Sequence, residues 1–322
     1  MSEERKMRNE ATPKMHMLEI DLALGAMENR LSDGEKVFII SGAEADYRVD
    51  GRRCEDFRNI MVESGVIDTT DGSARVRFAT TDLLVGVKCE LQSVEDSAAV
   101  QDRIRFSVDC SANATPQFEG KGGNEFADEI ACALRTAYSN DYVVPDFEKL
   151  AVSPSHVWIL HVDIVILQYG GSIIEAASIG AIAALTDTNI CEVETKPADE
   201  NRVTVEMSEM GKVWNLDTTR FPVIVSVNKL GKANVVDCSL NEETCIRSAV
   251  CFGFSFSNKM HITGQTENRL SLIRKMSGGS LDPVSMREMA ELALRVASLL
   301  HKELHSHLLN EVKRPAGYTF LD

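Results

Sequence analysis

The 322-residue sequence predicts an α+β fold with two similar halves, each made of strands followed by helices packed on mixed sheets. Three observations carry this prediction. Apolar and polar residues alternate strictly over Thr81–Leu91, which is typical of an antiparallel strand with one buried face. Val157–Leu167 is almost entirely apolar and rich in Val and Ile, as in a strand buried on both faces. Ile173–Leu185 is apolar nearly all round, as in a helix that lies inside a core. Helices packed on one side of the sheets would account for both this helix and the doubly buried strand.

The first half of the chain is predicted to open with helices and to continue as strands. Leu18–Arg30 has the spacing of one amphipathic helix, although a loosely held extension also fits these residues. A second short helix begins at Ser32 or Asp33, because either side chain can cap it. The strand over Arg58–Ile67 leads to Asp71-Gly72, which is a turn signal. Alternating strands follow over residues 74–78, 81–91 and 104–110, and helical spacing then begins over Asn124–Tyr138.

The second half is predicted to repeat this order. Further strands are predicted near Arg202–Glu209, Pro222–Val227, Ala233–Asp237 and Arg247–Ser257. The closing helix has the clearest signals, because Asp282 can cap it and Pro283 occupies its first turn. Its apolar stripe is formed by Met289, Ala293, Val296, Leu300 and Leu304.

Composition limits the classes of function. The 49 Asp and Glu residues outnumber the 34 Lys and Arg residues, so the formal charge is −15. Non-specific nucleic-acid affinity comes from Lys and Arg that neutralise phosphates, so this balance argues against a self-sufficient RNA or DNA binder. No apolar stretch has the length of a membrane span, and the N-terminus lacks the apolar region of a secretory signal. Eight cysteines without a Cys-x-x-Cys pair argue against a disulfide or zinc framework.

The turn Gly170-Gly171-Ser172 is the first candidate binding site. It lies between the predicted buried strand and the helix after it, where free backbone N–H groups and the helix dipole can hold an anion. A plain tight turn is the alternative interpretation. A working phosphate site would normally add an arginine. Ile173, Ile174 and Glu175 follow instead, and an apolar pair with an acid makes phosphate binding less favourable.

Two acids and three histidines are further candidates. Asp237 and Glu243 flank a short loop after a strand, and paired carboxylates can bind Mg²⁺ or act as acid and base. A solvated loop over residues 241–243 is the alternative. His301, His305 and His307 end the closing helix. Because no acid or cysteine stands at ligand spacing, we interpret them as a solvated helix end and predict no metal site.

Several motifs, in a fixed order, carry a family resemblance. Asp46-Tyr-Arg-Val-Asp-Gly-Arg52 and Asp56-Phe-Arg58 stand first, and Gly72–Val76 with Thr81–Lys88 has the form of a first hairpin. The series continues with Cys110–Gly123, Val236–Cys238, Asn241–Glu243 and Gly279–Pro283. Together these segments resemble the RNase PH-like ring subunits of the eukaryotic RNA exosome over roughly residues 32–310, and residues 110–123 look like one eukaryotic paralogue.

The resemblance implies a fold, a domain organisation and partners. The RNase PH-like fold, which is ribosomal protein S5 domain 2-like, would cover residues 32–312, with halves of about 32–200 and 201–312. Residues 1–31 would form a loosely ordered N-terminal extension and residues 313–322 a C-terminal tail. The implied partners are other RNase PH-like subunits in a hetero-hexameric ring, cap subunits, a separate catalytic nuclease and single-stranded RNA in the shared channel, with no membrane. The expected locations are the nucleus, the nucleolus and the cytoplasm.

Active members of the family that this chain resembles are phosphorolytic 3′→5′ exoribonucleases. They hold phosphate with a Gly-Gly-Ser/Thr-Arg turn and keep two Asp residues near the reacting phosphodiester. Gly170, Gly171 and Ser172 match the turn and Asp237 matches the first acid, whereas Ile173 replaces the Arg and Glu243 replaces the second Asp. Loss of the guanidinium removes the fixed positive charge that would hold phosphate beside RNA.

Two functional hypotheses follow from this degenerate site. The first is a non-catalytic ring subunit without a cofactor, with a structural and channel-wall role in 3′→5′ RNA processing and degradation, including ribosomal RNA maturation. The alternative is an active phosphate-dependent exoribonuclease that releases nucleoside diphosphates.

Four basic residues are candidates for the RNA path, namely Arg75, Arg77, Lys121 and Arg135. Arg75 and Arg77 project from one strand face, where a polar sheet surface or a subunit contact is equally compatible with the pattern. Arg135 is the one basic residue over 124–138, where active relatives carry several, so the sequence predicts a thin grip on RNA.

Overall fold

The first sheet contains the strands that the alternating patterns predict. The computed structural model describes residues 31–97, 100–115, 118, 122–197, 203–207, 211–260 and 266–311, so Lys121 and the possible helix over 18–30 lie outside it. The strand order is β1-β2-β3-β6-β4, with β5 paired to β6, and β4 runs parallel to β6 while the other pairs are antiparallel. Its strands are β1 (Ile60–Ser64), β2 (Gly72–Phe78), β3 (Thr81–Ser93), β4 (Ile104–Cys110), β5 (Ala151–Ser153) and β6 (His156–Gln168).

The second sheet is antiparallel throughout, in the order β12-β11-β13-β14. It therefore differs from the mixed sheet expected in this half. Its strands are β11 (Val223–Leu230), β12 (Ala233–Val236), β13 (Ser248–Met260) and β14 (Thr266–Lys275). Two small two-stranded sheets pair β7 (Ile190–Cys191) with β10 (Val213–Trp214) and β8 (Val193–Pro197) with β9 (Val203–Met207).

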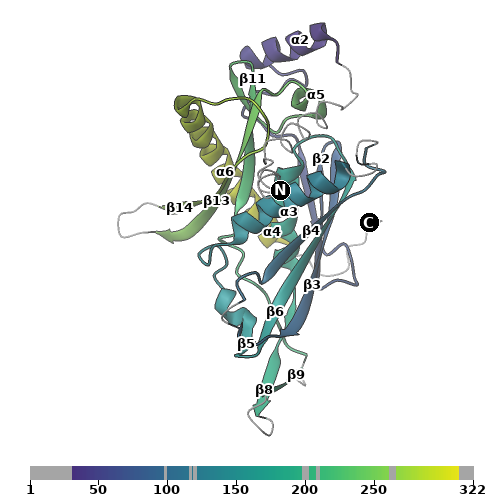
Figure 1. The fold of residues 1–322 in the computed structure, drawn as a ribbon, viewed down its shortest axis with the longest axis vertical. Helices are drawn as coiled ribbons and strands as arrows, with labels where there is room; N and C mark the ends of the chain where they lie inside the picture. Colours follow the sequence, from purple (N-terminus) through teal and green to yellow (C-terminus); the bar gives the residue numbers. More distant parts are fainter. Residues whose placement is uncertain are drawn as a thin grey trace, which may run out of the picture.

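Helices fill the space between the two sheets and cover the outside of the second one (Figure 1). Helix α4 (Ile173–Asp187) packs against β2 and β3 on one side and against β11 on the other, while α3 (Gly122–Tyr138) packs on β4 and β14. The long helix α6 (Pro283–Glu311) lies against β11 and β13. The remaining helices are α2 (Asp33–Glu44), the 3₁₀ helix η3 (Phe147–Leu150) and the short α5 (Leu240–Glu243). The fold is thus α+β with helices packed on sheets, as predicted.

The strand buried on both faces is β11 rather than β6. In β6, Val157–Leu160 is buried, but Asp163 and Leu167 beyond it are exposed, so the prediction for this strand is only partly correct. Neighbouring helices explain the difference, because α3 and α4 cover one face of the first sheet, whereas β11 has α4 on one side and α6 on the other. The helix predicted inside the core is confirmed, since α4 is buried from Ile173 to Leu185.

Two further predictions need correction. Asp71-Gly72 does not form a two-residue turn. Gly72 is already the first residue of β2, where it pairs with Val87 of β3, and the connection from β1 to β2 spans residues 65–71. The edge strand β14 was not predicted; Leu272 is its one buried large apolar residue among those whose burial is described, so it lacks a strong periodic signal. The predicted closing helix is confirmed, and the backbone N–H groups of Val284 and Ser285 donate to Asp282 Oδ1, as expected of a cap. Within the described residues, no helix is long and apolar enough to cross a membrane.

A capping box holds the start of α2. The Glu35 N–H donates to Ser32 Oγ at 3.3 Å, and the Ser32 N–H donates to Glu35 Oε2 at 2.7 Å. We expect Ser32→Ala to remove this cap at a cost of about 1 kcal/mol. Amide hydrogen exchange over α2 should then become about fivefold faster. The control is Ser41→Ala at an exposed position within the helix; equal exchange rates in the two variants would contradict the prediction.

Candidate functional site

The turn between β6 and α4 has a backbone that glycine permits. Gly171 has φ +94° and Ser172 has φ +55°, so two consecutive residues lie in the left-handed region. A Cβ at Gly171 would come within 2.3 Å of the Cys238 carbonyl oxygen, and one at Gly170 within 2.1 Å of Thr80 Oγ1. The Thr81 hydroxyl donates to the Gly171 carbonyl and accepts from the Gly170 N–H. The sequence therefore folds this turn tightly against the loop that follows β12.

Asp237 lies in that loop and is held by two arginines from the segment before β1. It has φ +46° and is fully buried. Its Oδ2 accepts from Arg52 Nη1 at 2.9 Å and from the Arg58 backbone N–H at 2.7 Å, while its Oδ1 accepts from Arg58 Nη2 at 2.7 Å. Both oxygens of this carboxylate are therefore bonded to guanidinium and backbone donors of the chain itself.

Arg58 also binds the glycine turn. Its Nη1 donates to the Gly170 carbonyl at 2.8 Å and its Nη2 to the Gly171 carbonyl at 3.1 Å. One guanidinium thus connects the turn to Asp237, and its donors point at carbonyl and carboxylate oxygens of the chain itself. The structure therefore uses this charge to hold the site together.

Glu243 lies at the N-terminus of α4, the end of the helix at which the sequence predicted a possible anion site. The Ser172 backbone N–H, at the N-terminus of α4, donates to Glu243 Oε1 at 2.8 Å, and the Tyr169 hydroxyl donates to Glu243 Oε2 at 2.5 Å. Burial raises the pKa of the Glu243 carboxyl, and nearby Asp237 adds to this effect, although the donors Tyr169 and Ser172 and the charge of Arg58 oppose it. The anion-binding end of α4 is satisfied by a side chain of the protein.

A cavity of about 650 Å³ opens beside this site. Its lining includes Ile173 and Glu175 from α4, Glu129 from α3 and Glu243. Ile173 is buried, so an apolar side chain fills the position next to the Ser172 N–H. Lys36 and Arg247 are the basic residues of the lining as described. The lining as described thus carries three carboxyl groups and two basic side chains.

A buried ion pair fixes the loop of Asp237 from the other side. Arg48 donates through Nε and Nη2 to the two oxygens of Glu242, at 2.8 and 2.5 Å, and both side chains are almost fully buried. Arg48 Nη2 also donates to the Asp237 carbonyl at 2.7 Å. Burial pushes the pKa of Glu242 upward, but the hydrogen bonds and charge of Arg48, together with Ser239, outweigh it and leave the pKa lowered. The interpretation of residues 241–243 as a solvated loop is therefore wrong, although Asn241 itself is exposed.

The RNA-path candidates do not gather at the glycine turn. Arg75 and Arg77 lie on the face of β2 opposite the buried Ala74 and Val76, and both contact Asp82, at 2.7 and 3.5 Å. Arg135 is exposed on α3, and Lys121 lies outside the described residues. None of the three described arginines lines the cavity. Their role in an RNA path remains a prediction.

Two of the three histidines near the end of α6 are shielded from solvent, so their interpretation as a solvated helix end is wrong for His301 and His305, whereas His307 is exposed. His301 is 5% exposed, and its Nε2 lies 3.1 Å from the Thr219 carbonyl oxygen. Burial, with the neighbouring His301, lowers the pKa of His305 to about 4. His307 Nε2 lies 3.0 Å from the Val62 carbonyl oxygen. These rings dock the helix onto the body, and no group of three potential metal ligands occurs among the described residues.

The side chains that complete this site have no predicted role in the sequence. Arg48, Arg52 and Arg58 stand within the motifs that carry the family resemblance, and Tyr169 precedes the glycine turn. Arg48 and Glu242 are 194 residues apart and Arg58 and Asp237 are 179 apart, so no local pattern connects them. The one available signal was the density of arginine in residues 48–58 of an otherwise acidic chain.

Known proteins resemble this chain over most of its length. Residues 56–191 match the 3′ exoribonuclease family, domain 1 (RNase PH). A Dictyostelium discoideum protein named putative exosome complex exonuclease RRP42 is 26% identical, over 85% of this chain and 98% of its own length. The exosome complex component Rrp42 of Thermococcus kodakarensis is 29% identical over 80% of this chain and 89% of its own length. The component of the same name from Saccharolobus solfataricus is also 29% identical, over 85% of this chain and 94% of its own length.

Solved structures agree on the fold. A chain of the Archaeoglobus fulgidus exosome with RNA bound to the active site superposes with a TM-score of 0.66 at 23% identity, covering 89% of this chain and 99% of its own. A chain of an archaeal exosome core gives a TM-score of 0.63 at 22% identity, with 90% and 99% coverage. The match over 56–191, the near full-length relatives and the shared fold confirm the resemblance to RNase PH-like exosome subunits that was stated on the motifs.

Proposed function

We propose that this chain is a ring subunit of an RNA exosome and that it serves 3′→5′ RNA processing and degradation, including ribosomal RNA maturation, without catalysing phosphorolysis. Its partners would be other RNase PH-like subunits in a hetero-hexameric ring, cap subunits, a separate catalytic nuclease and single-stranded RNA in the shared channel. The names of its relatives, which are exosome complex components, support the placement in a ring. We also propose nuclear, nucleolar and cytoplasmic locations, where such RNAs are processed.

The observation that carries the non-catalytic assignment is the position of Glu243. Its carboxylate accepts the Ser172 N–H that a phosphate would need, and Ile173 stands where the family motif has arginine. A phosphate entering this site would have to displace the Glu243 carboxylate, and the nearby Arg58 guanidinium is already bonded to Asp237 and to the carbonyls of the glycine turn. Electrostatic stabilisation of this kind is usually the largest catalytic contribution, so its loss removes the basis for turnover.

The test is a phosphorolysis assay on a ring containing this chain. The chain would be purified with its RNase PH-like neighbours, each inactivated at its own site, and supplied with labelled RNA and inorganic phosphate. We expect stable assembly by native mass spectrometry and no release of nucleoside diphosphate above the rate without protein.

The control for the assay is Glu243→Gln. This variant keeps the size of the side chain and an acceptor for the Ser172 N–H, so it should fold, whereas Asp237→Ala would release Arg52 and Arg58 inside the protein. Nucleoside diphosphate release that disappears in Glu243→Gln would establish the active exoribonuclease instead. A chain that stays monomeric beside all RNase PH-like partners would overturn the ring assignment.

A further inference from the structure

One end of the molecule carries four large apolar side chains that stay exposed among the residues that the structure describes. Val37 and Phe38 on α2 are 62% and 68% exposed, and Tyr47 and Val49 on the loop after it are 69% and 66% exposed. We call these four residues the α2 face. Other large apolar side chains with such exposure, Val284, Leu299 and Leu309, are spread along α6. In Figure 1, α2 lies at the opposite end of the molecule from the β8–β9 hairpin.

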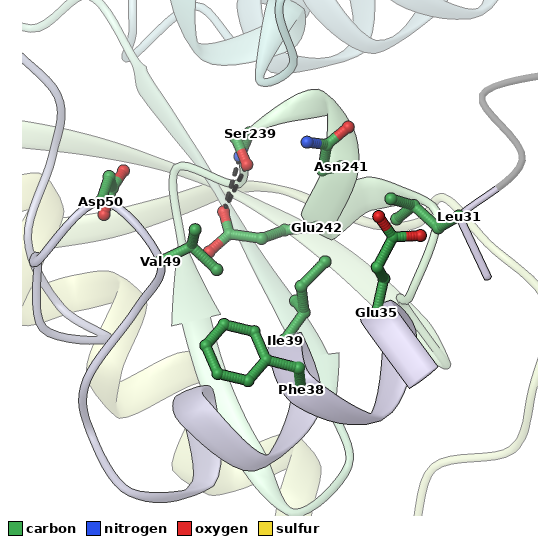
Figure 2. Close-up of a pocket in the computed structure, with 9 residues that line it drawn as sticks. All are labelled: Leu31, Glu35, Phe38, Ile39, Val49, Asp50, Ser239, Asn241 and Glu242. Atoms are coloured by element: carbon green, nitrogen blue, oxygen red, sulfur yellow. Dashed lines mark hydrogen bonds between the residues drawn. The ribbon is translucent and has the colours of Figure 1, made fainter. Parts of the chain in front are cut away.

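A pocket opens within the α2 face. It has a volume of about 330 Å³, and Phe38, Ile39 and Val49 contribute apolar walls to it (Figure 2). Figure 2 shows Glu35 and Asn241 at its margin and Glu242 at its base, where the hydrogen bonds from Ser239 and the pair with Arg48 occupy the carboxylate. A volume of this size accepts one aliphatic or aromatic side chain.

The loop that presents Tyr47 and Val49 is fixed rather than free. The Tyr47 N–H donates to the Gly42 carbonyl at 2.9 Å, and the Arg48 N–H donates to the Arg52 carbonyl at 3.0 Å. Between the two exposed side chains, Arg48 points inward to its buried pair with Glu242. A partner would therefore meet a preorganised surface and would not have to order it, which is the property that turns apolar contact into affinity.

The charge of the pocket indicates the chemistry of the partner. Its lining contains Glu35, Asp50 and Glu242 and, as described, no Lys or Arg. The hydrogen bonds from Ser32 lower the pKa of Glu35, so this exposed side chain is a carboxylate at neutral pH. Asp50 pairs with Arg52 at 2.7 Å but keeps 44% of its side chain exposed. A complementary segment carries an apolar anchor for the pocket beside a lysine or arginine that faces Glu35, which lies across the pocket from Asp50 in Figure 2.

We propose that the α2 face is a docking site for another subunit of the exosome assembly, which inserts one large apolar side chain into the pocket and places a Lys or Arg beside Glu35. The inference rests on the proposed function, because that function supplies the partner. It goes beyond it by naming which surface of the chain is bound and by which chemistry.

The experiment replaces Phe38 with the photo-crosslinker p-benzoylphenylalanine in the full chain, within the reconstituted assembly. We expect a crosslink to another subunit, at a peptide with a basic residue near the attachment point. A crosslink to residues 1–30 of the same chain, to a second copy of it, or to nothing would overturn the proposal. Assembly is measured before irradiation, by native mass spectrometry. A chain that does not enter the assembly contradicts the proposed function, whereas an assembled chain without the expected crosslink contradicts only the docking proposal.

Phe38→Asp supplies the quantitative arm, because its exposed site lets the chain fold with an unchanged melting midpoint. We expect at least about tenfold weaker binding to the docked subunit, since buried aromatic anchors dominate interface energies. The matched control is Leu299→Asp, at a residue 65% exposed on α6. Normal binding by Phe38→Asp, or an equal loss in Leu299→Asp, would overturn the proposal while leaving the ring assignment intact.

Discussion

Replacing Arg48 with methionine is expected to lower the free energy of unfolding by about 3–5 kcal/mol, because it leaves Glu242 charged and almost fully buried. Arg48 satisfies both oxygens of Glu242 and also donates to the Val236 and Asp237 carbonyls, at 3.1 and 2.7 Å. The variant would therefore lose one of the contacts, beside those of Arg52 and Arg58, that fix the segment before β1 against the loop of Asp237. Denaturant unfolding followed by tryptophan fluorescence, since Trp158 and Trp214 lie in different sheets, measures the loss.

The double variant Arg48→Met with Glu242→Leu separates the cost of an unpaired buried carboxylate from the cost of the lost Arg48 contacts. Removing both charges leaves no uncompensated ion, so the double variant is expected to unfold at higher denaturant than Arg48→Met alone. The matched control is Arg75→Met, whose partner Asp82 and own side chain are partly exposed, and surface pairs contribute about 0–1 kcal/mol. Equal losses in Arg48→Met and Arg75→Met would contradict the interpretation of the buried pair.

The contrast between these two arginines explains what the sequence could predict. Periodicity is local, so the alternation over β3, the apolar helix α4 and the capped helix α6 were all predicted close to their observed bounds. A pairing between Arg48 and Glu242 has no local signal, because 194 residues separate them. In sequence, Arg48 and Arg75 are both arginines among acids; only the fold buries one and exposes the other.

The same reason limited the prediction of the site. The turn Gly170-Gly171-Ser172 and the substitution at Ile173 could be read from the sequence, because they form one continuous motif. Glu243 looked like a lengthened catalytic acid at a distance from the turn. The fold brings its carboxylate onto the Ser172 N–H, so the change that matters is where the carboxylate lies rather than how long its side chain is.

Glu175 is expected to make the stability of the protein fall as pH rises from about 4.5 to about 7. The side chain is fully buried, its Oε1 accepts from the Ser226 N–H at 2.9 Å and from the Ser226 hydroxyl, and its Oε2 has no partner among the described residues. Burial raises its pKa to about 7 from the ordinary 4.5, and the charge of Asp237 acts in the same direction, whereas the hydrogen bonds from Ser226 oppose the rise.

The sign follows from which state holds the proton. Between pH 4.5 and 7 the unfolded chain releases the Glu175 proton while the folded chain keeps it, so each rise in pH favours unfolding until the folded pKa is passed. A shift of this size corresponds to about 3 kcal/mol, fully lost above pH 8 and restored below pH 4. Glu175→Gln removes the titration, so the free energy of unfolding of the variant minus that of wild type should be about 3 kcal/mol higher at pH 8 than at pH 4, which means that the variant is relatively more stable at pH 8.

The control is Glu125→Gln, which removes an exposed carboxylate from the first turn of α3 and reports the effect of one surface charge. Comparing each variant with wild type cancels the titration of Glu243 and of every other group the proteins share. If the difference between Glu175→Gln and wild type were the same at both pH values, Glu175 would titrate alike in the folded and unfolded chains. The cavity beside α4 would then hold a charged carboxylate at no cost, which requires a donor for Oε2 that the described fold does not supply.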